Sequence, residues 1–173
     1  VNLLNHVVGN VGETVRLDRP LEYGAVASFG ELQRLVSAMA AGEIEVLIVH
    51  GADPVHSTPP AAGFAAALAK VKFKFSLASS LDDTAERCDV LLPGRHWLES
   101  LGDARSVAGV HSLQQPAMAK VPLFDSRPAG DTLIALAQAA GFGRFPADWE
   151  AYLKNEWQPL HARFGPGKTF EVF

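Results

Sequence analysis

The chain has 173 residues, with 48% hydrophobic and 20% charged side chains and a net charge of −4, which suits one globular domain with a small addition but not two independent enzymes. The weak negative charge gives no reason to expect a nucleic-acid partner, and no apolar run approaches the ~20 residues of a membrane span. The single cysteine, Cys88, excludes a disulfide framework and a four-thiolate iron–sulfur cluster held by this chain alone.

Two helical segments are predicted before the first strand. Residues 2–9 have the pattern of the end of a helix, which Gly9 and Gly12 stop. Ser28 and Glu31 form a capping box, in which each side chain can bond the backbone N–H of the other residue. Apolar residues then recur at helical spacing until Gly42 ends the segment.

The most informative segment is residues 46–54, an apolar run that stops at His50 and a Gly-Ala-Asp-Pro turn. Four aliphatic residues without polar interruption predict a strand covered on both faces, as in a parallel sheet. Gly51 permits positive-φ backbone and Pro54 disfavours helical backbone at Asp53, so we expect the turn neither to extend the strand nor to begin a helix directly. The turn is therefore expected at the carboxyl end of a central strand, where open α/β sheets bind their ligands.

Two further strands are predicted at residues 73–78 and 89–92, each preceded by a helix. The first of these helices begins near Thr58, and the second, at residues 84–88, is capped by residues 79–83. The resulting βαβαβ unit has right-handed crossovers, so its three strand ends lie along one edge of a parallel sheet. The sequence therefore predicts an α/β fold with its functional residues at that edge.

The last third of the chain is predicted to be less regular. Residues 97–125 show no periodic pattern, and a connection of this length is usually functional or wrapped on a partner. A helix follows from Asp131 to Ala140, and a final helix carries Trp149, Leu153 and Trp157 on one stripe. The sequence thus predicts a main domain over residues 1–141 and a C-terminal helical extension over residues 142–173.

Both ends of the chain have the pattern of interrupted elements. The chain starts at Val1 inside a helix-like segment, and residues 169–173 have the pattern of the start of a strand. We therefore expect the chain to be a piece excised from a longer polypeptide.

The residues at the predicted edge allow more than one kind of site. No glycine-rich dinucleotide loop follows the first strand, which argues against ordinary nicotinamide binding. His50, His56 and His96, together with Asp53, form either a metal site or, as we favour, the polar lining of a cleft.

Other candidate side chains have simpler interpretations. Asp82 and Asp83 form either an acid/base pair or caps of the following helix, and the backbone N–H groups of that helix could instead hold an anionic group. Cys88 precedes a buried strand and is interpreted as an inert core thiol. The chain contains neither a serine-hydrolase elbow nor a phosphate-binding Gly-Lys-Ser/Thr loop.

The order and spacing of three short motifs resemble the molybdopterin oxidoreductase superfamily. The motifs are Gly-Ala-Asp-Pro at 51–54, Asp-Asp-Thr-Ala-Glu-Arg-Cys-Asp-Val-Leu-Leu-Pro at 82–93 and Glu-Ser-Leu-Gly-Asp at 99–103. The resemblance covers residues 2–141 and implies the third domain of the large subunit, a Rossmann-like three-layer domain with a mostly parallel sheet.

For active members of that superfamily, the resemblance implies contacts with one guanosine arm of a bis-pterin guanine dinucleotide that holds molybdenum or tungsten. Transferred by position, it implies cofactor contacts from Gly51, Ala52, Asp53, Pro54, Ser79, Ser80, Pro93, Gly94 and Arg95. The metal would be ligated outside this chain, and the resemblance places no catalytic residue within it.

The chain departs from the family pattern at several positions. The family usually has asparagine where Asp53 stands, and its Glu-x-x-Gly-Thr-x-x-Asn-x-Glu-Gly-Arg motif is altered here. Threonine, asparagine, glutamate and arginine of that motif are replaced by Asp103, Ser106, Ala108 and Val110. The loss of the glutamate and the arginine removes a salt-bridged brace near the cofactor loops.

The stretch from Trp97 to Pro116 is most similar to the iron–sulfur large subunit of alternative complex III and related quinol-linked respiratory complexes. In that branch the scaffold carries iron–sulfur clusters and no molybdenum cofactor. The resemblance implies a bacterial parent protein that passes electrons from quinol toward a cytochrome or oxidase. It also implies other subunits of a membrane complex as partners, with the periplasmic face of the membrane as one location.

Three functions are consistent with these patterns. The first is a structural scaffold with a degenerate pterin-dinucleotide pocket, and the second is a guanosine-arm-binding domain of an active molybdenum or tungsten oxidoreductase. The third is a free nucleotide-binding regulatory module. The altered motif favours the scaffold, the interrupted ends argue against the free module, and we expect the chain alone to have no redox activity.

Overall fold

The structure, a computed structural model, describes residues 1–18, 26–118 and 125–165, with the backbone alone at Phe164. The chain forms two compact units, Val1–Val26 with Gly102–Gln114 and Ala27–Leu101 with Gln115–Phe173. Each unit is described by itself. The strand predicted at residues 169–173 lies outside the described residues.

The first unit consists of a short helix and a β-hairpin. Helix α1 spans Asn2–Val7 and is followed by Gly9 at φ +75°, close to the predicted helix end. Strands β4 (Gly102–Val107) and β5 (Val110–Gln114) pair antiparallel around Gly109, which has φ +77°. The prediction of an irregular segment over residues 97–125 was therefore wrong for this part. Strand β4 contains residues of low strand propensity, and cross-strand pairing rather than propensity forms it.

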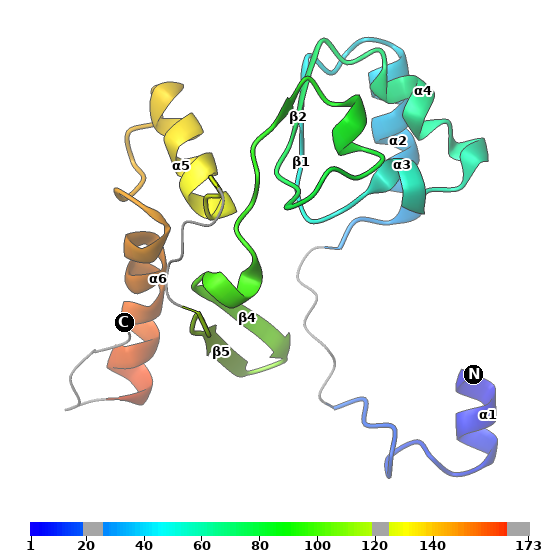
Figure 1. Ribbon diagram of the computed structural model, residues 1–173. Helices are drawn as coiled ribbons and strands as arrows, with labels where there is room; N and C mark the ends of the chain where they lie inside the picture. The colour runs from blue at the N-terminus through cyan, green and yellow to red at the C-terminus, as the bar shows by residue number, and fades with distance from the viewer. Residues whose placement is uncertain (19–25, 119–124, 166–173) are drawn as a thin grey trace. The chain divides into compact units, whose positions relative to one another are not determined.

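The second unit contains a three-stranded parallel sheet. Its strands are β1 (Val46–Val49), β2 (Phe73–Ser76) and β3 (Val90–Leu91), in the order β1-β2-β3 (Figure 1). The register places Val46 opposite Phe73, and Phe75 opposite Val90. The parallel pairing confirms the predicted α/β fold, which is consistent with a Rossmann-like domain.

One face of this sheet is covered by helices that precede and follow β1. Helix α2 (Phe29–Ala40) begins with the predicted capping box, and helix α4 spans Phe64–Leu68. Their buried side chains form one core cluster, against which Leu47 of β1 packs. The cluster consists of Val36, Met39, Phe64, Ala67, Leu68 and Val71.

The connections between the strands differ from the predicted single helices. Helix α3 (Pro54–Ser57) begins directly after the β1 turn, with Asp53 as its N-cap, so the expectation that this turn begins no helix was wrong. Pro54 occupies the first turn of α3, where its missing N–H is harmless. The 3₁₀ turn η1 (Pro60–Ala62) lies between α3 and α4. It ends at Gly63, which adopts φ +69° and precedes α4. The connection before β3 is also a 3₁₀ turn, η2 (Ala85–Arg87).

The outer strand β1 is less buried than predicted. Side chains of Leu47 and Val49 face the covered side, whereas Val46 and Ile48 are 55% and 43% exposed on the other side. Among the described residues, no strand pairs with the outer edge of β1. The expectation of a central strand covered on both faces was therefore wrong, because an apolar run does not reveal where in a sheet its strand lies.

Two helices complete the second unit. Helix α5 spans Ala129–Ala139 and lies on the side of the sheet opposite α2 and α4 (Figure 1). Helix α6 spans Trp149–Phe164, which confirms the predicted C-terminal helix. Gly130 permits close contact between the helices, because a Cβ atom there would lie 2.4 Å from the Trp149 ring. No helix within the described residues is long and apolar enough to cross a membrane.

Candidate functional site

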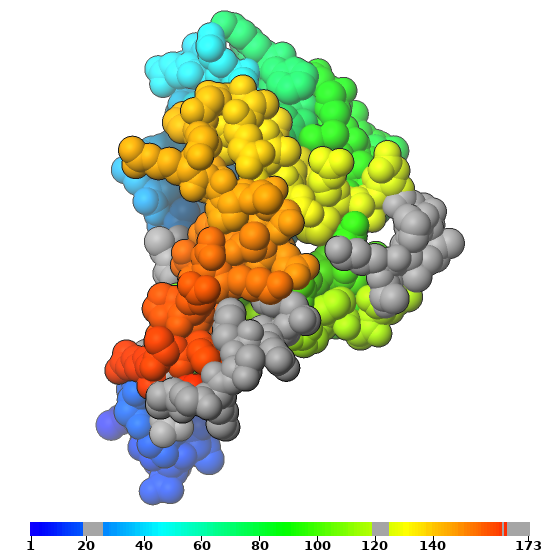
Figure 2. Space-filling model, turned by 90° about the vertical axis from the view of Figure 1, so that its left-hand side faces the viewer, coloured from blue at the N-terminus to red at the C-terminus, as the bar shows by residue number. Residues whose placement is uncertain are grey.

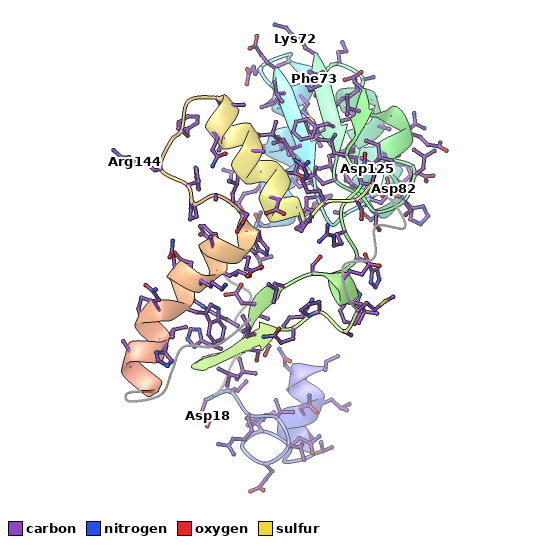
Figure 3. The ribbon with its side chains drawn as sticks, turned by 60° about the vertical axis from the view of Figure 1, so that its left-hand side comes forward. Asp18, Lys72, Phe73, Asp82, Asp125 and Arg144 are labelled. Carbon is purple, nitrogen blue, oxygen red and sulfur yellow. The ribbon has the colours of Figure 1, made fainter. Side chains whose placement is uncertain are left out.

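The carboxyl ends of the three parallel strands meet around a hollow of about 480 Å³. This position is the one expected for a ligand site in an open α/β sheet. Figure 3 labels Asp82 at this edge of the unit. The hollow is lined by His50, Gly51, Ala52, Asp53, Leu77, Ala78, Ser79, Ser80, Asp82, Gly94, Arg95, His96, Trp97 and Ala129.

The hollow brings together all the predicted cofactor-contacting residues except Pro54 and Pro93. Pro54 lies in the first turn of α3, and Pro93 lines a separate hollow of about 470 Å³ beside α5. The remaining residues can contact a ligand only with atoms that do not already form hydrogen bonds within the protein.

Asp53 is held in place by hydrogen bonds to two neighbouring segments. Its Oδ1 atom accepts a 2.6 Å hydrogen bond from the Thr84 hydroxyl and a 3.3 Å bond from the backbone N–H of His56. The Thr84 oxygen in turn accepts the N–H of Val55 at 3.0 Å, and Thr84 is fully buried. Asp53 therefore caps α3 and connects the turn after β1 to the turn after β2.

The same contacts keep Asp53 charged. The hydrogen bond from Thr84, followed by those from the backbone, holds the pKa of the Asp53 carboxyl below its ordinary value. The hollow therefore contains a carboxylate at neutral pH.

The two glycines of the hollow are needed for different physical reasons. Gly51 adopts φ +65° with open space where a Cβ would lie, so its requirement is conformational. Gly94 lies so close to β2 that a Cβ would be 2.5 Å from the carbonyl oxygen of Leu77. The Gly94 N–H also bonds the carbonyl of Ala78 at 3.3 Å. Gly94 thus allows the chain after β3 to run against the end of β2.

Arg95 supplies positive charge to the hollow but is partly engaged elsewhere. Its backbone N–H bonds the carbonyl of Arg127 at 3.0 Å, and its guanidinium Nη2 donates to the carbonyl of Ser126 at 3.3 Å. The exposed residues Ser79 and Ser80 also line the hollow. Their hydroxyls are the neutral hydrogen-bonding groups of this edge.

The histidines do not converge on one point. His56 faces Asp83, with 3.4 Å between Nδ1 and Oδ2 and both side chains well exposed, whereas His50 and His96 line the hollow. The described part of the chain contains no group of three or more side chains arranged to hold a metal ion. His50 and His96 are therefore part of the lining of the hollow, and His56 is not.

Asp82 and Cys88 also have local roles. The Asp82 carboxylate accepts the N–H of Ala85 at 2.7 Å, which confirms its interpretation as a cap. Burial is the main cause that raises the pKa of the half-buried Cys88 thiol, so the thiol stays protonated at neutral pH.

Two residues of this edge were missed by sequence reasoning. Thr84 joins the two turns from a fully buried position, and no local pattern distinguishes it from other threonines. Trp97 is 61% exposed at the hollow, with its ring 5.4 Å from that of His96. No local sequence pattern indicates the exposure of Trp97, which the tertiary structure alone shows.

Trp149, the first residue of the aromatic stripe of α6, packs against neighbouring segments. The Trp149 indole N–H donates to the carbonyl of Leu101 at 3.0 Å, and the Trp149 backbone N–H donates to Asp131 at 2.7 Å. The Trp149 ring also stacks on Tyr152 with 5.3 Å between centroids. These contacts join α6 to the start of α5 and to the segment after Arg95.

Comparison with known proteins identifies relatives of this chain. It is 40% identical over 131 residues to the menaquinone reductase molybdopterin-binding-like subunit of Nitratidesulfovibrio vulgaris, an alignment that covers 72% of the chain and 19% of the relative. It is 29% identical over 142 residues to a nitrate reductase of Shewanella frigidimarina, covering 80% of the chain and 15% of the relative. No protein-family model matches the chain.

The chain therefore spans less than a fifth of the length of these curated relatives. These relatives support a relationship of the chain to the molybdopterin oxidoreductase family.

Proposed function

We propose that the chain is the Rossmann-like domain of a molybdopterin oxidoreductase-family subunit in a membrane-linked respiratory electron-transfer complex. In this proposal it is a structural scaffold whose pterin-dinucleotide pocket is degenerate. The main domain extends over residues 1–141, and its partners are the other domains of the same polypeptide and other subunits of the complex. Iron–sulfur clusters of the parent protein carry the electrons.

The observation that carries the proposal is the engagement of Asp53. Where the resemblance implies a neutral asparagine beside the cofactor, this chain has a charged carboxylate whose Oδ1 atom already bonds Thr84 and His56. A dinucleotide diphosphate is anionic, so a fixed negative charge at this point disfavours its binding. Asp82 adds a second carboxylate to the hollow, and Arg95 is its one arginine. These two carboxylates support a degenerate pocket over one that binds an anionic dinucleotide.

The name of one relative agrees with the proposal. The menaquinone reductase subunit is described as molybdopterin-binding-like, and its name places it in a quinone-linked enzyme. The altered motif at Asp103, Ser106, Ala108 and Val110 adds departures from the family pattern outside the hollow.

The alternative function is the binding of one guanosine arm of a bis-pterin guanine dinucleotide in an active enzyme. The specific observation that favours it is the open carboxyl edge itself, where Gly51 leaves space for a ligand and Ser79 and Ser80 offer hydroxyls. The relative described as a nitrate reductase is consistent with this alternative.

Metal and pterin analysis of the longer natural polypeptide separates the two functions. We expect iron in the purified protein, with molybdenum, tungsten and released pterin far below one per polypeptide. Stoichiometric molybdenum or tungsten together with pterin would show that the pocket is functional and would overturn the scaffold proposal. A matched preparation of a known molybdenum oxidoreductase, purified in the same way, controls for loss of the cofactor during purification.

A further inference from the structure

The face of the sheet opposite α2 and α4 is only half covered. Residues paired in a parallel register project to the same face, so Val46, Ile48, Phe73 and Phe75 share this side. Phe75 is 6% exposed, whereas Val46, Ile48 and Phe73 are 55%, 43% and 44% exposed. We call these three exposed residues the open sheet face. Figure 3 labels Phe73, one of these three residues.

Helix α5 lies on the same side of the sheet as the open sheet face (Figure 1). Its residues Thr132, Ala135 and Leu136 line a hollow together with Leu91 and Leu92 at the end of β3. In Figure 2 the yellow atoms of α5 lie in front of the sheet region, part of which remains in view above them. The open sheet face and α5 therefore lie on one side of the sheet, opposite α2 and α4.

The chemistry of the open sheet face indicates what completes this layer. Its three side chains are all large and apolar, and exposed groups of this kind mark contact surfaces rather than solvated ones. A sheet with parallel strands is normally covered by helices on both faces. The complementary surface is the apolar stripe of a helix that runs beside α5.

We propose that a helix from another domain of the same, longer polypeptide packs on the open sheet face. The inference rests on the proposed function, in which this chain is one domain of a larger subunit. The relatives support this source of the helix, because the aligned residues make up only 19% and 15% of their lengths. A domain of a protein that is several times longer has neighbouring segments that can supply such a helix.

Substitutions of Ile48, made both in the 173-residue chain and in the longer natural polypeptide, test the inference. In the chain alone, Ile48→Lys should shift the thermal unfolding midpoint by less than about 2 °C, because a lysine at a half-exposed position reaches solvent. In the longer polypeptide the same lysine should lower the midpoint of this domain by about 4 °C or more, because its charge is buried under the helix. Ile48→Val is the matched control and should cost less than half as much as Ile48→Lys in the longer polypeptide.

Hydroxyl-radical labelling gives a second measurement without any substitution. Phe73 should be labelled readily in the 173-residue chain and fall to the level of Phe75 in the longer polypeptide. Equal labelling of Phe73 in the two forms, or equal tolerance of Ile48→Lys, would overturn the inference. A 173-residue chain that forms a dimer, and becomes monomeric with Ile48→Lys, would identify a second copy as the occupant and would also overturn it.

The failure of this inference is distinguishable from the failure of the proposed function. Stoichiometric molybdenum and pterin in the longer polypeptide would contradict the scaffold function while leaving the covered sheet face intact. An accessible Phe73 in a longer polypeptide without molybdenum would contradict only the inference that a helix packs on the open sheet face. If the protein purified from its natural source is no larger than the 18.5 kDa chain, both the proposed function and the inferred helix would be overturned.

Discussion

The hydroxyl of Thr84 donates a 2.6 Å hydrogen bond to the Oδ1 atom of Asp53, and this pair joins the turn after β1 to the turn after β2. The two residues are 31 positions apart in the sequence, and Thr84 has no exposed surface. Because the same hydroxyl oxygen accepts the N–H of Val55, the two turns are held by consecutive hydrogen bonds. This arrangement holds the Asp53 side chain, which lines the hollow at the carboxyl edge of the sheet.

Replacement of Thr84 by valine should destabilise the protein. Thr84→Val keeps the side-chain shape but leaves Asp53 and the N–H of Val55 without their partner, a cost of about 1–3 kcal/mol. Urea unfolding followed by circular dichroism measures this change. Thr132→Val is the matched control, because the Thr132 hydroxyl makes only a 3.5 Å contact with the Pro128 carbonyl. Equal stabilities of the two variants would contradict the role assigned to Thr84.

The lowered pKa of Asp53 predicts a dependence of stability on acid pH. A carboxyl whose pKa is lower in the folded state contributes stability above its unfolded pKa, and this contribution is lost as the pH falls through the folded pKa. We therefore expect Asp53→Asn to lose less stability than the natural protein between about pH 5 and pH 2. Unfolding midpoints measured across this range test the prediction. Asp125→Asn is the matched control, because it removes a carboxylate that lines the hollow beside α5 instead.

Gly94 should not tolerate a side chain. In Gly94→Ala the new Cβ would meet the Leu77 carbonyl oxygen at 2.5 Å, and the backbone on both sides must move to relieve the contact. We expect a loss of about 1–3 kcal/mol in the free energy of unfolding, measured by urea denaturation. Gly143→Ala is the control, because nothing lies within 4 Å of a Cβ there, and it should change stability by less than about 0.5 kcal/mol.

Guanosine diphosphate should bind the 173-residue chain weakly or not at all. With the Asp53 carboxylate in the hollow, isothermal titration calorimetry should detect no specific binding with a Kd below about 1 mM. Asp53→Asn removes the charge while its amide oxygen can still accept the Thr84 hydrogen bond, so this variant should bind the nucleotide more tightly than the natural chain. A specific low-micromolar response of the natural chain would contradict a degenerate pocket.

The purified chain should show no quinol oxidation and no reduction of artificial electron acceptors. With one cysteine, the chain by itself does not supply the four thiolates of the usual iron–sulfur cluster. Since proteins supply binding and orientation while cofactors carry electron transfer, turnover requires the rest of the parent protein. Stopped-flow absorbance with a soluble quinol analogue measures this, and the longer natural polypeptide with its cofactors is the positive control.

Local sequence patterns were sufficient for several elements of this fold. The capping box of Ser28 and Glu31 begins α2 as predicted, because both partners lie within one helical turn. The apolar runs identified the three strands of the parallel sheet, and the helical crossovers predicted between them favoured parallel pairing. From these elements alone, the carboxyl edge could be identified as the place where most of the predicted site residues meet.

The tertiary structure decided how the residues of that edge are used and how the sheet is covered. Asp53 follows the strand in the sequence and caps α3. Its carboxylate also accepts a hydrogen bond from Thr84, which only the packed sheet brings near. The exposure of Val46 and Ile48 likewise depends on the position of β1 at the outer edge, which an apolar run does not encode. Patterns within a few residues specify helices and strands, whereas hydrogen bonds and burial across the sheet depend on segments that are distant in the chain.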